Sequence, residues 1–555
     1  GMKLKLPRIF LYLLVLIFIL NLLQAYFTEL IFDEAYYWYY AQNMAWGYFD
    51  HPPMVALMIK IGSLLFSGEL GVRFISTLFS AGTYIALWFL FDNQEKNKYV
   101  RHYFVLIFSM TLIHAYGFLT LPDTPLLFFT ALFLLFYKKF LKSPSIGISI
   151  ILGLAMAALM YSKYHAVLVI LFVLASNLRL VFNKYAWLSV LVSLICYTPH
   201  FIWLINNDFI SIKYHLFERP NRAYEFGDFT VGFFINLMVI FGLTFPWIYR
   251  ALLKTNNNDK FNKALLFLIY GIIAFFFISS FNRRVQTQWL IVICIPMIVV
   301  VYNQILEDRV TRKWIYILGM ANIVILMFLR IGLIYPPLFP IVYETHGNKD
   351  WVNEISSQVG SIPVIFENSY TKAPMYSFYS GNTSYSLNNI MYRQNQFTLD
   401  ESENLVQGQK VIYISRFMDE GDISYYDAKG DKHYGIYIDD FESFRKLRTI
   451  IDEPVELLEN KYLDFKIYNP YATDIEISKL EFGVVFLNKY KNFREVQKSE
   501  ARPSHENMSI LKSKDTTSFK ILMPEPKIND AYFFKISISE NGLYWGINGE
   551  NVKLP

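Results

Sequence analysis

The strongest constraint on this chain is a series of long apolar segments within residues 9–335. A helix needs about 20 mostly apolar residues to cross the hydrocarbon core of a bilayer. The candidate spans lie near 9–27, 70–91, 102–118, 124–141, 146–162, 165–178, 186–205, 231–249, 264–280, 289–303 and 315–335. In a chain that is 54% hydrophobic and 17% charged, they predict a polytopic α-helical membrane protein. We expect about 11 transmembrane helices, within a range of roughly 10–13, because several segments are short.

The placement of lysine and arginine predicts the orientation of these spans. The stretches 96–101, 138–142 and 250–263 are rich in lysine or in both residues, and all three are expected on the same side as the N-terminus. Positive residues favour the cytoplasmic side. We therefore expect a cytoplasmic N-terminus and a C-terminal domain outside. No clear cleavage site follows the first span, which is expected to remain as an uncleaved anchor.

The chain after residue 344 has the pattern of a soluble protein. Helix and strand patterns alternate over 345–454, as in "DWVNEISSQV" followed by "IPVIFEN", which predicts a small α/β region. Over 455–555 strand patterns predominate, with turn residues between them, which predicts a β-sandwich-like region. We expect these two extracytoplasmic regions to follow a transmembrane domain over 1–344.

The first outside loop, 28–69, is expected to form two short helices. The stretch "DEAYYWYYAQNMAWGYF" spreads aromatic residues around a helix, and "PPMVALMIKIGSLLF" opens with proline, a residue common at helix starts. Aromatic side chains favour the headgroup region of a bilayer. We therefore expect both helices to lie at the outer membrane interface.

Three acidic residues fall on this same outer face. Asp33 and Glu34 begin "DEAYYW", and Asp123 lies in the short outside turn "LTLPDTPLL". Helix capping is the simpler interpretation of each. Ionisable side chains near the bilayer are costly, however, and by default they indicate function. Acids that converge beside apolar walls are the arrangement that general-base chemistry needs.

Basic and polar residues on the outer face indicate an anionic ligand. Asp50 and His51 in "YFDHPP" form either a turn or part of a phosphate site. Lys163 in "MYSKYHAVL" either extends its amine to the interface or binds an anion. Arg283 and Arg284 lie outside, against the positive-inside trend. The sequence predicts a site that handles an anionic group attached to a lipid.

Several of these stretches resemble one family. The run "DEAYYWYYAQNMAWGYFDHPPMVALMI" resembles the first periplasmic loop of the bacterial dolichyl-phosphate-mannose–protein mannosyltransferase-like enzymes, a GT-C group that includes the lipid A aminoarabinose transferase. The stretches "LPDTPLLFF" and "YSKYHAVL", the pattern Pro199, Trp203, Asn206, and the pattern Gln286, Gln288, Trp289 follow in the family's order. The resemblance covers about residues 28–300, and the combination of motifs carries it.

The resemblance implies an enzyme that moves a sugar from a polyprenyl-phosphate carrier to an acceptor hydroxyl on the periplasmic face, with inversion. It implies that Asp33 is the general base, Glu34 its neighbour at the acceptor and Asp123 a second acid. His51 stands where the aminoarabinose transferase has a lysine for the carrier phosphate. The implied donor-phosphate and lipid ligands are Tyr48, Asp50, His51, Lys163, Arg283 and Arg284, and the implied acceptor or sugar ligands are Tyr37, Asn206, His215, Gln288 and Trp289.

The resemblance also implies a location in the bacterial inner membrane, with a lipid-linked sugar donor and a glycan, lipid or protein acceptor as partners. The sequence requires no cofactor, and a divalent metal held by Asp33 and Asp123 is an alternative. The net charge of +5 is too small to indicate a nucleic-acid partner. A transporter or flippase for a lipid-linked glycan is the alternative function, and a membrane-anchored binding protein is a third. A transporter would favour charged residues and broken helices at the bilayer midplane.

Overall fold

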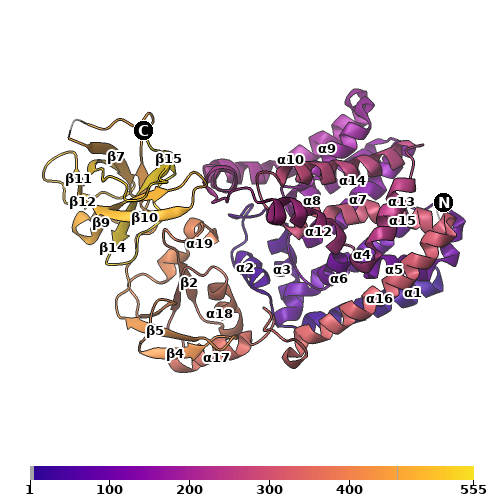
Figure 1. The fold of residues 1–555 in the computed structure, drawn as a ribbon, viewed down its shortest axis with the longest axis horizontal. Coiled ribbons are helices and arrows are strands. Elements are labelled where there is room, and N and C mark those ends of the chain that lie inside the picture. Colours follow the sequence, from indigo (N-terminus) through magenta and orange to yellow (C-terminus); the bar gives the residue numbers. More distant parts are fainter. Residues whose placement is uncertain (1–4, 459) are drawn as a thin grey trace. The chain divides into compact units, whose positions relative to one another are not determined.

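The computed structural model describes residues 5–458 and 460–555, so the first four residues of the expected transmembrane domain lie outside it. The chain forms two compact units. One contains the chain up to Asp208 together with Tyr224–His346, and the other contains Phe209–Ala223 together with Gly347–Pro555. The loop that follows residue 208 is thus part of the second unit. Figure 1 shows helices in the first unit and strands with a few helices in the second.

The first unit is a bundle of apolar helices. Its main helices are α1 (Arg8–Phe27), α2 (Phe32–Gln42), α3 (Met54–Leu65), α4 (Gly68–Trp88), α5 (Val100–Phe108), α6 (Thr111–Tyr116), α7 (Asp123–Lys142), α8 (Ile146–Ser162), α9 (Ala166–Ser176), α10 (Lys184–Asn206), α12 (Gly232–Val239), α13 (Phe245–Lys254), α14 (Lys260–Ser279), α15 (Cys294–Glu307) and α16 (Arg309–Ile334). Every expected span falls on helical segments of this series. The prediction of a polytopic helical membrane protein is therefore confirmed.

Seven helical segments of the described chain are long and apolar enough to cross a bilayer, and an eighth is added if one bent pair counts as a single span. That pair, Phe226–Val239 and Gly242–Lys254, bends by 98°. The other expected spans are short or broken, since α9 has 11 residues and the segment at 102–118 is divided between α5 and α6. The number of 11 spans stays a prediction.

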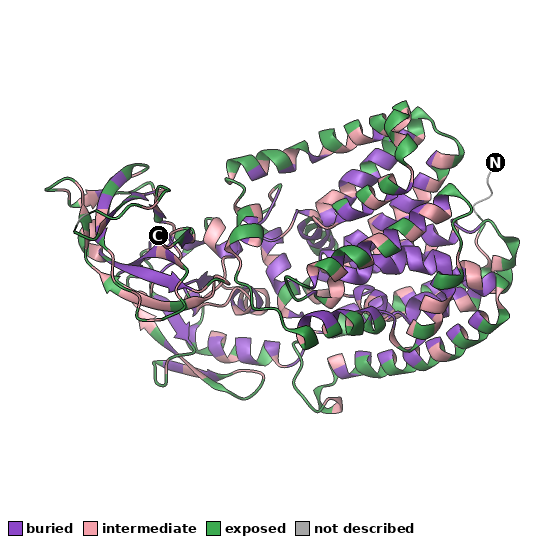
Figure 2. Ribbon diagram, turned by 45° about the horizontal axis from the view of Figure 1, so that its top comes forward, coloured by how far each residue is buried: buried purple, intermediate pink, exposed green. Residues whose placement is uncertain are grey.

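The surface of the bundle is apolar where membrane helices face lipid. On α1, for example, Leu11, Leu16 and Ile19 are exposed. Figure 2 shows exposed residues along the outer sides of the helices and buried residues between them. In water such a surface would be unfavourable, whereas in a bilayer the lipid chains cover it.

The loop 28–69 forms the two helices that its sequence predicts, α2 and α3. Pro53 immediately precedes α3 and is its N-cap residue, in keeping with the fixed backbone angle of proline at a helix start. Asp33 and Glu34 lie in the first turn of α2, where carboxylates are favoured by the partial positive charge of the helix N-terminus.

The second unit begins with a five-stranded mixed sheet in the order β2-β1-β3-β5-β4. Its strands are β1 (Val364–Glu367), β2 (Ser384–Leu387), β3 (Val411–Ser415), β4 (Ile423–Tyr426) and β5 (Lys432–Ile438), with helices α17 (Asn348–Val359), α18 (Lys372–Ser380) and α19 (Gln396–Leu399) between them. Strands β1 and β2 pair in parallel, as do β1 and β3, whereas β5 is antiparallel to its neighbours. This is the α/β layer that the alternating pattern predicts.

The rest of the second unit is a sandwich of two four-stranded sheets, β10-β9-β14-β15 and β11-β13-β7-β6. The strands are β6 (Arg448–Ile450), β7 (Tyr462–Tyr468), β9 (Leu480–Leu487), β10 (Phe493–Ser499), β11 (Ala501–Pro503), β13 (Thr516–Leu522), β14 (Phe533–Glu540) and β15 (Val552–Lys553), and a small separate ladder joins β8 (Ile475–Glu476) to β12 (Ile510–Leu511). Phe465 and Phe519 from one sheet meet Phe482 from the other in one buried core. The predicted β-sandwich-like region is therefore present.

Candidate active site

A buried ion pair between Glu34 and Arg73 joins several segments at one end of the helical bundle. Both side chains are completely buried, and the guanidinium holds the carboxylate at two points, Nε to Oε2 at 2.9 Å and Nη2 to Oε1 at 2.7 Å. The carboxylate also accepts hydrogen bonds from the backbone N–H groups of Ile31 at 3.2 Å and Thr120 at 3.0 Å. The remaining N–H groups of Arg73 donate to the carbonyls of Ala25, Thr28 and Glu29.

This pair therefore joins four parts of the chain: the end of α1, the start of α2, helix α4 and the segment before α7. The bond from Thr120 to Glu34 matters most for the site, because it brings "DEAYYW" against "LTLPDT". The two acidic motifs, about 90 residues apart in sequence, meet at one end of the bundle.

Asp33 lies beside this buried pair and is itself exposed. It is close enough to the Tyr116 hydroxyl to act on it electrostatically, and so is Asp123. The first turn of α2 thus contains an exposed carboxylate, Asp33, followed directly by a buried one, Glu34. An exposed carboxylate on a rigid helix start can accept a proton from a bound hydroxyl.

Asp123 forms a second buried ion pair, with Lys163. Asp123 is the first residue of α7, and Lys163 directly follows the last residue of α8. The Lys163 Nζ atom lies 2.8 Å from Asp123 Oδ1, and the two side chains are 10% and 6% exposed. From the sequence these residues are expected to have different roles, Asp123 as a second acid of the site and Lys163 as a ligand of the donor phosphate. The structure brings them into direct contact.

The carboxylate of Asp50 is held by tyrosines of α2. The Tyr36 hydroxyl donates to Asp50 Oδ2 at 2.7 Å, and the Tyr40 hydroxyl donates to the same oxygen at 3.2 Å. Tyr40 in turn stacks on Tyr48, with ring centroids 4.3 Å apart. Burial, with the Asp50 carboxylate as the next cause, raises the pKa of Tyr40 well above its usual range. Tyr40 therefore stays protonated and remains a donor to Asp50.

The loop that carries "WGYFDHPP" is anchored by α10. His200 is fully buried; its Nδ1 contacts the Trp46 carbonyl at 2.7 Å, and its Nε2 lies 2.9 Å from the Tyr164 hydroxyl. A carbonyl only accepts, so Nδ1 carries the proton, and in the neutral ring Nε2 accepts from Tyr164. Burial, and then the nearby Asp50 carboxylate, raises the pKa of Tyr164. Trp203 covers Gly47 so closely that a Cβ there would lie 2.4 Å from its ring.

The remaining predicted residues fall into three groups. Tyr37 and His51, both in the loop 28–69, contact each other edge to face, with ring centroids 5.5 Å apart. The ring of Trp289 contacts the ring of His165, with centroids 5.7 Å apart. Because His165 is two residues after Lys163, this contact places Trp289 near the Asp123–Lys163 pair. Of the others, Gln288 donates to Gln286, Arg284 pairs with Asp228 at 3.7 Å, Arg283 and Asn206 are exposed, and His215 belongs to the second unit.

Several residues of the site had not been singled out from the sequence, namely Tyr36, Tyr40, Arg73, Thr120, Tyr164 and His200. Arg73 carried a usable signal, because an arginine within the expected span 70–91 requires a buried partner. His200 lies inside the pattern Pro199, Trp203, Asn206, directly after Pro199. The tyrosines carried no such signal in a chain with 40 tyrosines.

The two acids proposed for a metal ion, Asp33 and Asp123, are not arranged as a metal site in the described residues. The Asp123 carboxylate is already bound to Lys163, and the residues that the structure describes contain no group of three or more His, Cys, Asp or Glu side chains placed to hold a metal. No chemical step is assigned to a metal here.

Comparisons with known proteins agree with this architecture. Residues 50–203 match the family described as dolichyl-phosphate-mannose-protein mannosyltransferase. The lipid A galacturonosyltransferase RgtD of Rhizobium johnstonii is 23% identical over 283 residues, which are 47% of this chain and 58% of that protein. The match therefore spans little more than half the length of this curated relative.

Two solved structures share the fold. ArnT from Cupriavidus metallidurans in its apo state has a TM-score of 0.51 and 13% identity, over 73% of this chain and 92% of that chain. ArnT from the same organism bound to undecaprenyl phosphate has a TM-score of 0.50 and 14% identity, over 77% and 96%. The protein is thus a polytopic membrane protein with the GT-C fold, and the resemblance to GT-C glycosyltransferases seen in its sequence is confirmed.

Proposed function

We propose that this protein is an integral membrane glycosyltransferase that moves a sugar from a polyprenyl-phosphate carrier to an acceptor hydroxyl at the periplasmic face. One sequence relative is named a lipid A galacturonosyltransferase, and one protein of the same fold is seen with undecaprenyl phosphate. Both support a lipid-linked donor and an acceptor on a cell-envelope glycan, lipid or protein. The protein is proposed to lie in a bacterial inner membrane with its N-terminus cytoplasmic.

The observation that carries this proposal is the convergence of separate outer loops on one constellation. Glu34 of the first loop binds the backbone of Thr120, Asp123 of the next loop binds Lys163, and the residue after Lys163 binds His200. His200 returns to the first loop through the Trp46 carbonyl. Carboxylates, an amine and aromatic rings therefore share one end of an apolar bundle, as a lipid-anchored anionic substrate requires.

Asp33 is the proposed general base. Its carboxylate accepts the proton of the acceptor hydroxyl while the hydroxyl oxygen attacks the anomeric carbon. The bond from that carbon to the phosphate oxygen breaks, and polyprenyl phosphate leaves with the electron pair. A single displacement of this kind inverts the anomeric configuration. A phosphate is a good leaving group, so the site needs no second proton-donating acid of the type that glycosidases use.

Lys163 and His51 are the proposed partners of the donor phosphate. Fixed positive charge stabilises the phosphate as its negative charge grows during bond cleavage. In the structure Lys163 is neutralised by Asp123, so this role requires the phosphate to share or replace that carboxylate. Glu34 and Arg73, which are closed in by their own hydrogen bonds, are proposed as positioning residues that set the place of Asp33.

Turnover by the purified protein tests the proposal. The protein in nanodiscs is offered a panel of polyprenyl-phosphate sugars with a membrane extract as the acceptor source, and the release of polyprenyl phosphate is measured. We expect one donor to be consumed by the parent and Asp33→Asn to lower the rate by about 10²- to 10⁴-fold, the usual contribution of a general base. Binding of the donor should persist in the variant.

Glu69→Gln is the matched control, because Glu69 is also an acid in the first turn of a helix at the end of the same loop. Its rate should stay within about threefold of the parent's, as expected of a residue that transfers no proton. Equal turnover by Asp33→Asn and the parent would remove Asp33 from the chemistry. Tight binding of a donor without any release would instead favour a transporter or a binding protein.

A further inference from the structure

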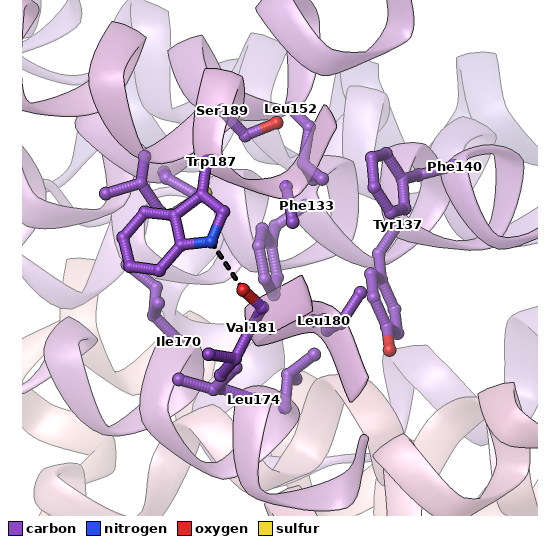
Figure 3. A pocket seen from close by; sticks show the side chains of 14 residues that line it. Phe133, Tyr137, Phe140, Leu152, Ile170, Leu174, Leu180, Val181, Trp187 and Ser189 are labelled. Atoms are coloured by element: carbon purple, nitrogen blue, oxygen red, sulfur yellow. Dashed lines mark hydrogen bonds between the residues drawn. The ribbon is translucent and has the colours of Figure 1, made fainter. Parts of the chain in front are cut away.

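An apolar cavity lies between α7, α8, α9 and α10 at the ends opposite to the candidate active site. It has a volume of about 130 Å³, and the side chains that line it include Phe133, Leu152, Ile170, Val181 and Trp187 (Figure 3). Helix α7 begins with Asp123 and contributes to the cavity only from Phe133 onward. The cavity is therefore distinct from the site that contains Asp123.

Two polar groups of the cavity wall are bonded within the protein, whereas the Tyr137 hydroxyl, which also lines the cavity, has no hydrogen-bond partner among the described residues. The indole N–H of Trp187 donates to the Val181 carbonyl at 2.6 Å, as Figure 3 shows, and the Ser189 hydroxyl donates to the Ser149 carbonyl at 2.7 Å. Neither group is left to bind a polar ligand. The cavity is suited to hydrocarbon.

The short length of α9 explains why the cavity exists. This helix ends at Ser176 after 11 residues, which is about half of what a bilayer-spanning helix needs. The chain then forms a short 3₁₀ helix, Leu178–Phe182, and α9 does not continue alongside its neighbouring helices. On that turn Leu178 is 67% exposed and Phe182 is 90% exposed. Apolar residues so exposed beside a membrane helix are covered by lipid.

A basic depression adjoins the cavity on the same turn. Arg179 and Lys184 line this depression together with Phe182, Asn183 and Tyr185, and neither its lining nor that of the cavity contains an acid. Both cations are exposed. Leu180 and Val181 line the cavity, while Arg179, the residue before them, lines the depression. One short segment thus offers hydrocarbon on one side and positive charge on the other.

We infer that this is a binding site for an anionic phospholipid of the membrane leaflet opposite to the active site, with part of one acyl chain in the cavity and the phosphate at Arg179 and Lys184. The volume is close to the roughly 150 Å³ of an apolar cavity that accommodates benzene, so it suits one segment of a single chain. Basic pockets between helices on the cytoplasmic side are suited to anionic headgroups. Tyr185 and Trp187 are aromatic residues of the kind that favour the headgroup region.

The charge complementarity is tested by lipid binding to the full-length protein. Native mass spectrometry compares the retention of phosphatidylglycerol and phosphatidylcholine by the parent and by the double variant Arg179→Ala/Lys184→Ala. We expect the parent to prefer phosphatidylglycerol, and the double variant to lose that preference by roughly 10- to 30-fold, given the effect of two basic residues near an anionic headgroup. Lys98→Ala/Arg101→Ala, which removes two exposed cations of another cytoplasmic loop, should keep the preference.

The apolar part of the site is tested by filling it. Ala186 lines the cavity, so Ala186→Phe should lower the retention of both lipids; if that variant does not fold, Met156→Phe tests the same wall. Equal retention of the two lipids by the parent would overturn the inference, and so would an equal loss in the control double variant. Specific competition at this site by undecaprenyl phosphate at the same concentration would also overturn it, because the site would then belong to the donor.

Discussion

The two buried ion pairs at one end of the helical bundle differ in how completely their hydrogen bonds are satisfied within the protein. Glu34 and Arg73 are fully buried, meet at two points and use their remaining donors and acceptors on the backbone of three segments. Asp123 and Lys163 meet through one oxygen and keep 6% and 10% of their side chains exposed. The first pair has no room for a substrate, whereas the second lies at the edge of accessible space.

This difference in internal hydrogen bonding indicates which of the two buried pairs can contact a substrate. A buried pair whose every hydrogen bond is internal specifies structure, and a substrate can reach it only by breaking several bonds at once. A pair with one bond can exchange its partner for a phosphate of similar charge. We therefore assign the Glu34–Arg73 pair to positioning and the Asp123–Lys163 pair to the substrate.

The largest predicted effect concerns the Glu34–Arg73 pair. Arg73→Met leaves the Glu34 carboxylate buried without its counter-charge, and we expect a loss of about 3–5 kcal/mol in the free energy of unfolding. Thermal unfolding of the protein in detergent measures the loss. The double variant Glu34→Gln/Arg73→Met should recover much of it, because no unpaired charge then remains. A change of less than about 0.5 kcal/mol in the single variant, the range of ordinary surface substitutions, would contradict the structural role.

The next effect distinguishes the two members of the Asp123–Lys163 pair. Lys163→Gln should weaken the binding of polyprenyl phosphate by about tenfold or more, since hydrogen bonds to charged groups contribute roughly 1.5–3 kcal/mol. Asp123→Asn should leave that binding unchanged or strengthen it, because it removes a negative charge beside the phosphate. Calorimetry with polyprenyl phosphate in nanodiscs measures both. Equal weakening by the two variants would mean that the pair, like the first one, is closed.

The smallest effects concern Asp50, a buried carboxylate that accepts hydrogen bonds from two tyrosine hydroxyls. Tyr36→Phe removes the 2.7 Å hydrogen bond to its carboxylate and should cost about 1 kcal/mol of stability, the usual net value of such a bond. Tyr40→Phe removes the longer bond of 3.2 Å and should cost less. Chemical unfolding of the two variants gives the comparison. A larger cost for Tyr40→Phe than for Tyr36→Phe would contradict this order.

The sequence was sufficient for the parts of the fold that depend on periodicity and length. The apolar segments predicted the helical membrane unit, and Pro53 marked the start of α3. The number of spans could not be settled in this way, because α9 and the α5–α6 pair are shorter than a bilayer and only their neighbours determine where they lie.

For the site, motif order placed Asp33 and Asp123 on one face, and the bond from Thr120 to Glu34 shows why these two motifs meet. The pairing of Asp123 with Lys163 could not be read from the sequence, since the residues are 40 positions apart and each had its own simple interpretation. The partner of Glu34 was missed for a different reason: Arg73 lies inside an apolar segment, where it was counted only as part of a span. Loop residues such as His215 belong to the second unit, which no local pattern indicates.

The position of the donor phosphate tests the central claim most directly. A cryo-electron microscopy structure of the protein in nanodiscs with bound polyprenyl phosphate would show it. The account predicts a phosphate oxygen about 2.7–2.9 Å from Lys163 Nζ, the length of a charge-assisted hydrogen bond, with the Asp33 carboxylate facing the same space. A phosphate bound at Arg283 and Arg284, with Asp33 and the Asp123–Lys163 pair untouched, would contradict it.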